Sequence, residues 1–153
     1  MEQDADFLSQ AIALAYANVE QGGRPFGALV VQNGKLIARG VNEIVQTNDP
    51  TAHAELMAIR AASKQLGSAS LAGCSVFASG HPCPMCMGAM RLAGIKAVTY
   101  AYSNEDGDPF GLSTAEIYAD LAEPFSRQSM TIRHVSTRLA DQPNLYAHWK
   151  HHQ

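Results

Sequence analysis

The middle of the chain contains two apolar runs, Ser75-Val76-Phe77-Ala78-Ser79 and Ala97-Val98-Thr99-Tyr100-Ala101, on either side of a segment from Pro84 to Leu92. Both runs are short and have the composition of buried strands, whereas the segment between them has the apolar spacing of a helix. A crossover helix between two strands is the connection that defines α/β folds. The sequence therefore predicts a strand, a helix and a second strand in one sheet.

Further elements precede this central unit. Apolar residues recur every three or four positions from Asp4 to Gln21, which predicts an amphipathic helix that Gly22-Gly23 ends. Two apolar runs at 28–32 and 35–39 flank Asn33-Gly34, a dipeptide that accepts the positive φ angles of a type I′ turn, so we expect a β-hairpin. A second helix is predicted from Ala52 to Leu66.

Three elements are expected after the central unit. They are a helix around 114–121, a strand around 130–135 and a closing helix from Pro143. The complete order is α-β-β-α-β-α-β-α-β-α, which contains five strands. Helices between strands favour a three-layer α/β/α sandwich.

The composition is that of one compact globular domain. The chain has 153 residues, of which 46% are hydrophobic and 16% are charged, so we expect a single domain over residues 1–153. It contains no apolar run of about 18 residues, and a membrane span is therefore not expected. Met1 to Asp6 carries three acidic residues and no basic segment, which does not resemble a secretory signal. We expect a cytoplasmic protein.

Three cysteines cannot all pair within one chain. Cys83 and Cys86 form a C-x-x-C in a turn bounded by prolines, which favours metal binding over a structural disulfide. Cys74 remains outside this motif and is followed by apolar residues. We interpret Cys74 as a buried free thiol in a strand.

Two fragments about thirty residues apart carry the chemistry: His53-Ala54-Glu55 and Pro82-Cys83-Pro84-Met85-Cys86. One imidazole and two thiolates are three ligands for a zinc ion, and three protein ligands leave the fourth position that a catalytic zinc site requires. The expectation is that Asp49-Pro50-Thr51 caps the second helix, which places His53 in its first turn. Pro84 suits the first position of the next helix, so both fragments are predicted to begin helices, whose positive ends favour thiolates.

Glu55 follows His53 by two residues, so the two side chains diverge on a regular helix. A carboxylate beside the metal can take a proton from water and return it to a departing amine. We predict that Glu55 is this proton shuttle. Each fragment alone has an ordinary interpretation, since a solvated His-x-Glu pair and a lone C-x-x-C are both common; together they predict a catalytic zinc site.

These fragments resemble the motif of a known enzyme family. An H-x-E followed by P-C-x-x-C is the zinc signature of nucleobase deaminases, and the chain is identified as a member of the cytidine deaminase superfamily. Over nearly its whole length it is similar to bacterial guanine deaminases. The segments that carry this resemblance are Gly23-Arg24-Pro25-Phe26-Gly27-Ala28, Asn48-Asp49-Pro50-Thr51-Ala52-His53-Ala54-Glu55 and Pro82-Cys83-Pro84-Met85-Cys86-Met87-Gly88-Ala89.

The resemblance implies a hydrolytic deaminase of a free nucleobase, guanine or a related aminopurine, with one Zn²⁺ per subunit. It also implies a homodimer, a five-stranded mixed sheet between helices, and a C-terminal segment that crosses to the partner subunit and covers its pocket. Asn42 and Phe26 are expected to touch the base, because an amide reads donors and acceptors and an aromatic ring stacks on a purine. Asn42 at a strand end and Phe26 in the core are the alternative interpretations.

Other site residues are expected as well. The backbone N–H groups of Ala54 and Cys83 are expected to polarise the reacting centre, with Pro82 beside them. Near the C-terminus, Tyr146 and Trp149 have the aromatic character of a lid, or equally of packing residues in a last helix.

The chain also departs from the guanine deaminase pattern. After the fourth strand that family has acidic residues that pair with guanine, whereas this chain has Gly111-Leu112-Ser113-Thr114. The nearby acidic residues are Asp106 and Asp108, and we take Asp108 as the candidate whose carboxylate binds the base. His81 stands where the family has a glutamate; it is either an additional ligand or a structural residue, and the three ligands already present favour the structural interpretation.

Three other functions remain open at this point. The first is a tRNA adenosine deaminase, a class that shares much of this sequence motif. A protein that binds a polyanion such as tRNA needs clusters of basic residues on its surface. This chain has 11 Lys and Arg against 14 Asp and Glu, a net charge of −3, so we expect a small substrate and no nucleic-acid partner. A cytidine or deoxycytidylate deaminase is the second alternative. A zinc-stabilised binding module without turnover is the third, and such a module has no use for Glu55.

Overall fold

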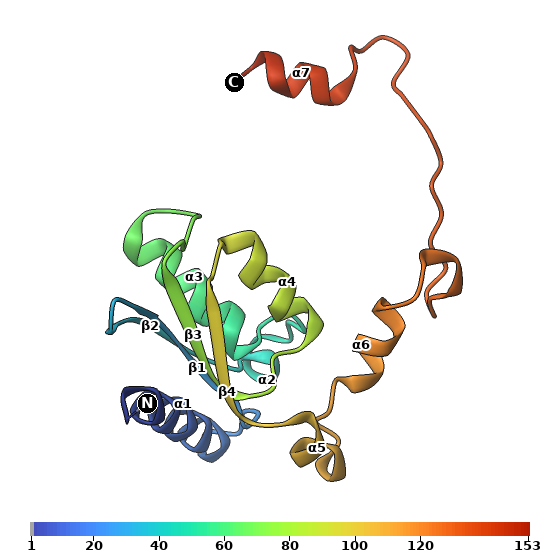
Figure 1. Cartoon of the computed structure of the whole chain (residues 1–153). Coiled ribbons are helices and arrows are strands. Elements are labelled where there is room, and N and C mark those ends of the chain that lie inside the picture. The colour runs from blue at the N-terminus through green and yellow to red at the C-terminus, as the bar shows by residue number, and fades with distance from the viewer. Residues whose placement is uncertain (1) are drawn as a thin grey trace. The chain divides into compact units, whose positions relative to one another are not determined.

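The computed structural model describes residues 2–153, and Figure 1 shows the course of the chain. The chain divides into two units, one up to residue 119 and the other from Asp120 to Gln153. The described residues form four strands, seven α-helices and two short 3₁₀ helices. That the whole chain is one domain stays a prediction.

The first unit contains a four-stranded mixed sheet. Its strands are β1 (Gly27–Gln32), β2 (Lys35–Val41), β3 (Cys74–Gly80) and β4 (Ala97–Tyr102). Their order in the sheet is β2-β1-β3-β4, with β1 antiparallel to β2 and β3 and with β3 parallel to β4. The predicted strand–helix–strand unit at 75–101 is thus the parallel pair of this sheet.

The expected count of five strands is wrong. Residues 130–135, which have an apolar pattern typical of a strand, form no strand here. A strand exists only where a neighbour pairs with its backbone groups. Within residues 2–153, this segment forms no backbone hydrogen bond with another strand.

The predicted hairpin is confirmed. Asn33 and Gly34 have φ angles of 51° and 77°, which are the positive values that a type I′ turn requires at both central positions. The turn places Gln32 opposite Lys35, and a register shift between Val30 and Val31 then brings Gly27 opposite Val41.

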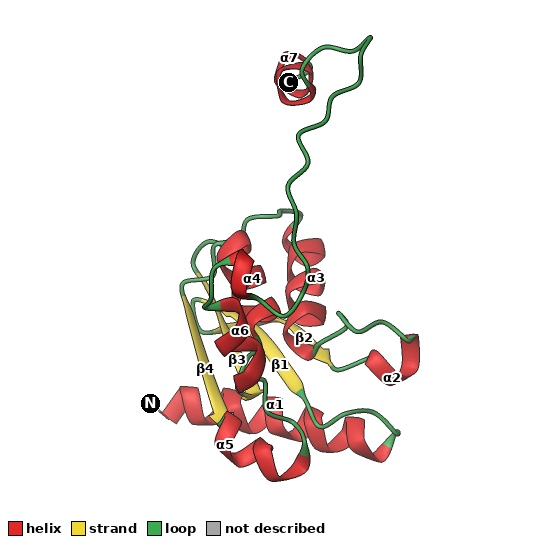
Figure 2. Ribbon diagram, turned by 90° about the vertical axis from the view of Figure 1, so that its right-hand side faces the viewer, coloured by secondary structure: helices red, strands yellow, loops and turns green. Residues whose placement is uncertain are grey.

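Helices cover both faces of the sheet, which confirms the three-layer arrangement (Figure 1, Figure 2). Helix α1 (Glu2–Glu20) packs on one face, where Leu29 and Val31 of β1 belong to one buried cluster with Phe7. Helices α3 (Ala54–Leu66) and α4 (Pro84–Ala93) pack on the other face, against a second cluster. The alternation of side chains along β1 thus supplies both cores.

Gly40 allows α3 to lie directly on β2. A Cβ atom at this position would be 2.4 Å from the backbone oxygen of Ala54 and 2.4 Å from the backbone nitrogen of Ala58. Only a residue without a side chain permits this close approach. The N-terminus of α3, which carries His53, is therefore fixed against the sheet.

Short helices connect and extend this framework. The helices predicted around 114–121 and after Pro143 are confirmed as α6 (Ala115–Leu121) and α7 (Leu145–His151). Two one-turn helices, α2 (Ile44–Thr47) and α5 (Asn104–Gly107), were not predicted, because one turn is too short to show an apolar repeat. The 3₁₀ helices span Asp108–Phe110 and Phe125–Arg127.

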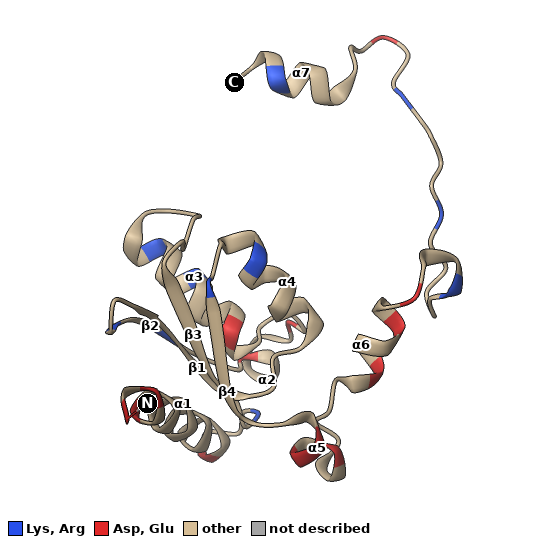
Figure 3. Ribbon diagram, in the orientation of Figure 1, with Lys and Arg blue, Asp and Glu red and all other residues tan. Residues whose placement is uncertain are grey.

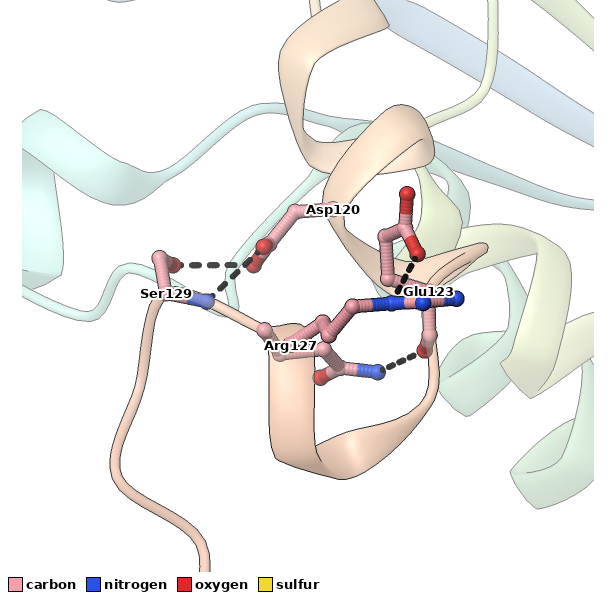
Figure 4. A network of polar contacts seen from close by, with 5 residues as sticks. Asp120, Glu123, Arg127 and Ser129 are labelled. Atoms are coloured by element: carbon pink, nitrogen blue, oxygen red, sulfur yellow. Dashed lines mark hydrogen bonds and ion pairs between the residues drawn. The ribbon is translucent and has the colours of Figure 1, made fainter.

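The second unit has its own polar contacts (Figure 4). The Asp120 carboxylate accepts hydrogen bonds from the backbone N–H and the hydroxyl of Ser129, both at 2.9 Å. Arg127 forms an ion pair with Glu123 at 3.1 Å, and Gln128 donates to the backbone oxygen of Glu123 at 2.8 Å. These contacts fold residues 120–129 into a compact loop around the second 3₁₀ helix.

Cys74 is fully buried in β3, and burial raises the pKa of its thiol, which confirms a buried free cysteine. Within residues 2–153, every helix is too short or too polar to span a bilayer.

Candidate active site

Both metal-motif fragments lie at helix starts, as predicted: Pro84 begins α4 as expected, whereas His53 lies just before the first turn of α3 and not inside it. His53 and Cys83 are the N-cap residues of α3 and α4, and each has an extended backbone conformation. The expectation that His53 lies inside the first turn is wrong. The reason is that Asp49 accepts hydrogen bonds from the backbone N–H and hydroxyl of Thr51, at 2.9 and 2.7 Å, so these residues form a separate turn and do not cap α3.

The structure brings the three predicted ligands together. Nδ1 of His53 lies 3.4 Å from Sγ of Cys83 and 3.6 Å from Sγ of Cys86, and the two sulfur atoms are 3.6 Å apart. A tetrahedral zinc ion with Zn–S of about 2.3 Å and Zn–N of about 2.0 Å separates such atoms by roughly 3.5–3.8 Å. The observed triangle therefore has the size that zinc requires. Within residues 2–153, it is the single cluster of three or more such side chains with this spacing.

The two thiols differ in their tendency to ionise. Hydrogen bonds from the Cys86 thiol, His53 and the Cys86 backbone N–H lower the pKa of Cys83 to about 4. The same contact and burial raise the pKa of Cys86. These contacts favour the thiolate form of Cys83, and cysteine ligands are deprotonated when they bind a metal.

Glu55 lies in the first turn of α3, beside this cluster. Its side chain is 6% exposed, and burial raises its pKa to about 7. A carboxyl group that exchanges a proton near neutral pH is suited to general acid–base chemistry.

The segment before Cys83 is held by a residue that the sequence did not single out. The hydroxyl of Tyr118, on α6, donates a hydrogen bond to the backbone oxygen of Pro82, which is itself fully buried. Ala54, also predicted at this site, is buried as the first residue of α3, where backbone N–H groups lack partners within the helix. No sequence signal marks Tyr118, because one tyrosine in an amphipathic helix is an ordinary packing residue.

The two residues expected to touch the base lie side by side. The backbone N–H of Asn42 donates to the backbone oxygen of Phe26 at 3.1 Å. Asn42 is 2% exposed and directly follows β2, and its side-chain oxygen accepts from the N–H of Ile44 at 3.0 Å. The ring of Phe26 packs close to Gly80 and lines a cavity of about 490 Å³. Their roles toward a substrate stay predictions.

The two nearby acids are placed differently. Asp106 lines the same cavity, but its carboxylate accepts the backbone N–H of Ser103 at 2.8 Å and caps α5. Asp108 is exposed and does not line the cavity. Thr114 carries a buried hydroxyl without a hydrogen bond, the single such side-chain atom among the described residues.

The ring of His81 packs between tyrosines. Its centroid is 4.8 Å from that of Tyr100 and 5.4 Å from that of Tyr118. His81 is not part of the metal-ligating triangle, which supports the structural interpretation of this residue.

The aromatic residues proposed as a lid belong to the second unit. Tyr146 and Trp149 lie on α7 and are 79% and 58% exposed. A role over the active site therefore stays a prediction.

Comparisons with known proteins agree with this geometry. A guanine deaminase of Bacillus subtilis is 42% identical over 131 residues, which are 85% of this chain and 84% of that protein. A crystal structure of guanine deaminase from Bacillus subtilis has a TM-score of 0.87 at 38% identity, over 96% of this chain and 93% of that one. A tRNA-specific adenosine deaminase of Aquifex aeolicus is 37% identical over 95 residues, 62% of this chain and 63% of that protein.

Residues 1–102 match the family described as the cytidine and deoxycytidylate deaminase zinc-binding region. This range contains His53, Cys83 and Cys86, which could hold a metal ion, and Glu55. The match covers two thirds of the chain, and the relatives add most of the rest. The chain belongs to this family of zinc-dependent hydrolytic deaminases.

Proposed function

We propose that this protein removes the amino group of a free nucleobase by hydrolysis, with guanine as the first substrate to test. Guanine would yield xanthine and ammonia. The observation that carries the proposal is the triangle of His53, Cys83 and Cys86 with the buried carboxyl of Glu55 beside it. The similarity to a guanine deaminase over 84% of that protein's length supports guanine within this class.

The three ligands fit a zinc ion, because their spacing and their chemistry are those of a three-ligand site. A zinc ion held there supplies Lewis acidity that activates water at neutral pH. In the reaction, a water oxygen bonds to the carbon that carries the amino group, and the C–N bond breaks. Glu55 takes a proton from the attacking water and delivers it to the departing nitrogen, which leaves as ammonia.

Phe26 and Asn42 would orient the base. The ring of Phe26 offers a stacking surface, and the amide of Asn42 can read a donor and an acceptor on the purine edge. The backbone N–H groups of Ala54 and Cys83, at the starts of the two helices, would polarise the reacting ring.

A related aminopurine is the second candidate substrate. The segment Gly111-Leu112-Ser113-Thr114 offers no carboxylate to pair with guanine, and Asp106 is already engaged as a helix cap.

A tRNA substrate is less well supported. The net charge is −3, and in the first unit Lys and Arg lie on separate elements, among them β2, α3 and α4 (Figure 3). Tight binding of a polyanion requires clustered basic side chains.

The protein would act in the cytoplasm, where free bases are available.

We also propose a homodimer in which the C-terminal segment crosses to the partner. β4 is an edge strand of the sheet, and its residues Tyr100 and Tyr102 are 41% and 51% exposed. An uncovered edge strand can pair with a second copy of the chain. Tyr146 and Trp149 would then cover the partner's pocket.

Ammonia release from a panel of bases tests the reaction. The panel contains guanine, adenine, cytosine, isocytosine and their nucleosides. Release from guanine or another free aminopurine supports the proposal. Activity confined to a tRNA anticodon stem contradicts it.

A mixing experiment tests the crossing segment. Glu55→Gln has an inactive site and an intact tail, whereas a Tyr146→Ala, Trp149→Ala double variant has an intact site and an altered tail. If tails cross, subunit exchange between the two inactive proteins restores about a quarter of wild-type activity. No recovery from mixed dimers contradicts the crossing.

A further inference from the structure

Asn18 is a buried polar residue that the proposed mechanism does not use. It lies in the last turn of α1, on the face toward the sheet, and is 6% exposed. A buried amide destabilises a protein unless its donors and acceptor are satisfied. The hydrogen-bond partners of this side chain therefore show which segments it connects.

All polar groups of the Asn18 side chain are engaged. Its Nδ2 donates to the backbone oxygens of Arg24 and Asn42, each at 2.8 Å, and its Oδ1 accepts from Nε2 of Gln46 at 3.3 Å. Gly23 is shaped to this side chain, because a Cβ there would lie 2.5 Å from Nδ2. One amide thus joins the end of α1, the loop before β1 and the segment after β2.

The two carbonyl groups that accept from Asn18 belong to Arg24 and to Asn42 itself, which is one of the two proposed base-contacting residues. The backbone N–H of Phe26 donates to the oxygen of Arg24 at 2.8 Å, and the N–H of Asn42 donates to the oxygen of Phe26 at 3.1 Å. Phe26 and Asn42 are therefore hydrogen-bonded to each other. Asn42 is also bonded directly to Asn18, and Phe26 is connected to Asn18 through the carbonyl group of Arg24. Their relative placement depends on a side chain that is outside the site.

We infer that Asn18 is a positioning residue that fixes Phe26 relative to Asn42 and so determines how tightly the base binds. The inference rests on the proposed function, since it assigns both residues to the base. Asn18 acts through these residues and leaves proton transfer at Glu55 unchanged.

Asn18→Asp is the sharpest test. It keeps the shape and the acceptor toward Gln46, but it removes both donors and places a carboxylate oxygen against two carbonyl oxygens. The expected result is a KM for the base raised about tenfold or more, with kcat within about threefold of wild type and one zinc per chain. Hydrogen exchange at the N–H of Asn42 should also become faster. Asn18→Ala, which leaves space for water, should show the same direction with a smaller rise in KM.

Val31→Ala is the matched control. Val31 is 5% exposed in the core under α1 and belongs to no part of the Asn18 network. It should lower the Tm by a comparable amount and leave KM unchanged. An unchanged KM in both Asn18 variants, with a wild type that deaminates free bases, contradicts this inference alone. A wild type without activity on any free base contradicts the proposed function as well, so the two failures are distinguishable.

Discussion

Nδ1 of His53 lies 3.4 Å from the sulfur of Cys83, although 30 residues separate them along the chain. Each residue is the N-cap of a helix, and the two helices share one face of the sheet. Helix N-termini carry partial positive charge, which stabilises thiolate sulfur. The metal-ligating triangle is therefore a direct consequence of where α3 and α4 begin.

Glu55→Gln should separate metal binding from turnover. The variant keeps the shape of the side chain but cannot accept a proton, so zinc content should remain at one per chain while kcat falls by about two to four orders of magnitude. Glu116→Gln, at an exposed position on α6, is the matched control and should behave like wild type. Zinc content and kcat are measured on the same samples. Activity of Glu55→Gln within a few-fold of wild type would exclude the assigned role.

Substitutions of Cys83 and Cys86 should release zinc, whereas a substitution of Cys74 should not. Cys83→Ser and Cys86→Ser each remove a thiolate from the triangle, so both proteins should lose zinc during dialysis and lose activity. Cys74→Ser changes a buried thiol in β3 and should retain zinc. Metal analysis after dialysis checks all three variants. A Cys83→Ser protein with a full equivalent of zinc would contradict the ligand assignment.

His81→Phe should retain one zinc per chain. The ring of His81 packs against Tyr100 and Tyr118, and a phenyl ring preserves that packing. The measurement is zinc content after dialysis, compared with Cys86→Ser. Loss of zinc from His81→Phe would show that His81 is a ligand after all.

In the zinc-free protein, ionisation of Glu55 should lower the free energy of unfolding as the pH rises. Burial raises the pKa of Glu55 to about 7 from an ordinary value of 4.5, so between these values the native state holds a proton that the unfolded state has lost. The native state therefore loses stability relative to the unfolded state as the pH rises from about 4.5 to 7. Above pH 7 the ionised Glu55 destabilises the native state by on the order of 3 kcal/mol.

Glu55→Gln removes that contribution. In urea unfolding of the zinc-free proteins, the variant should equal wild type near pH 4.5 and be more stable at pH 8. A difference in the free energy of unfolding that stays constant with pH would show that Glu55 has an ordinary pKa.

Much of the fold followed from local patterns in the sequence. The Asn33-Gly34 turn, the strand–helix–strand unit at 75–101 and the helix starts near His53 and Cys83 each depend on neighbouring residues, and each is present. The fifth strand is absent because pairing, unlike composition, depends on a partner edge. His53 is one position before its expected helical turn because Asp49 and Thr51 bond to each other.

The three candidate ligands could be recognised from the sequence, whereas the residues that support them could not. His, Cys and Glu at these spacings have a chemical meaning that the sequence alone conveys. Asn18 and Tyr118 act through backbone carbonyl groups, and the contacts exist only after α1 and α6 have packed. A single asparagine or tyrosine in an amphipathic helix gives no such signal.

X-ray absorption at the zinc edge tests the central claim most directly. The zinc-loaded protein should show two sulfur ligands at about 2.3 Å, one histidine nitrogen at about 2.0 Å and one further light atom from solvent. A protein that binds no zinc, or a spectrum with a fourth protein ligand that closes the site, would contradict the account.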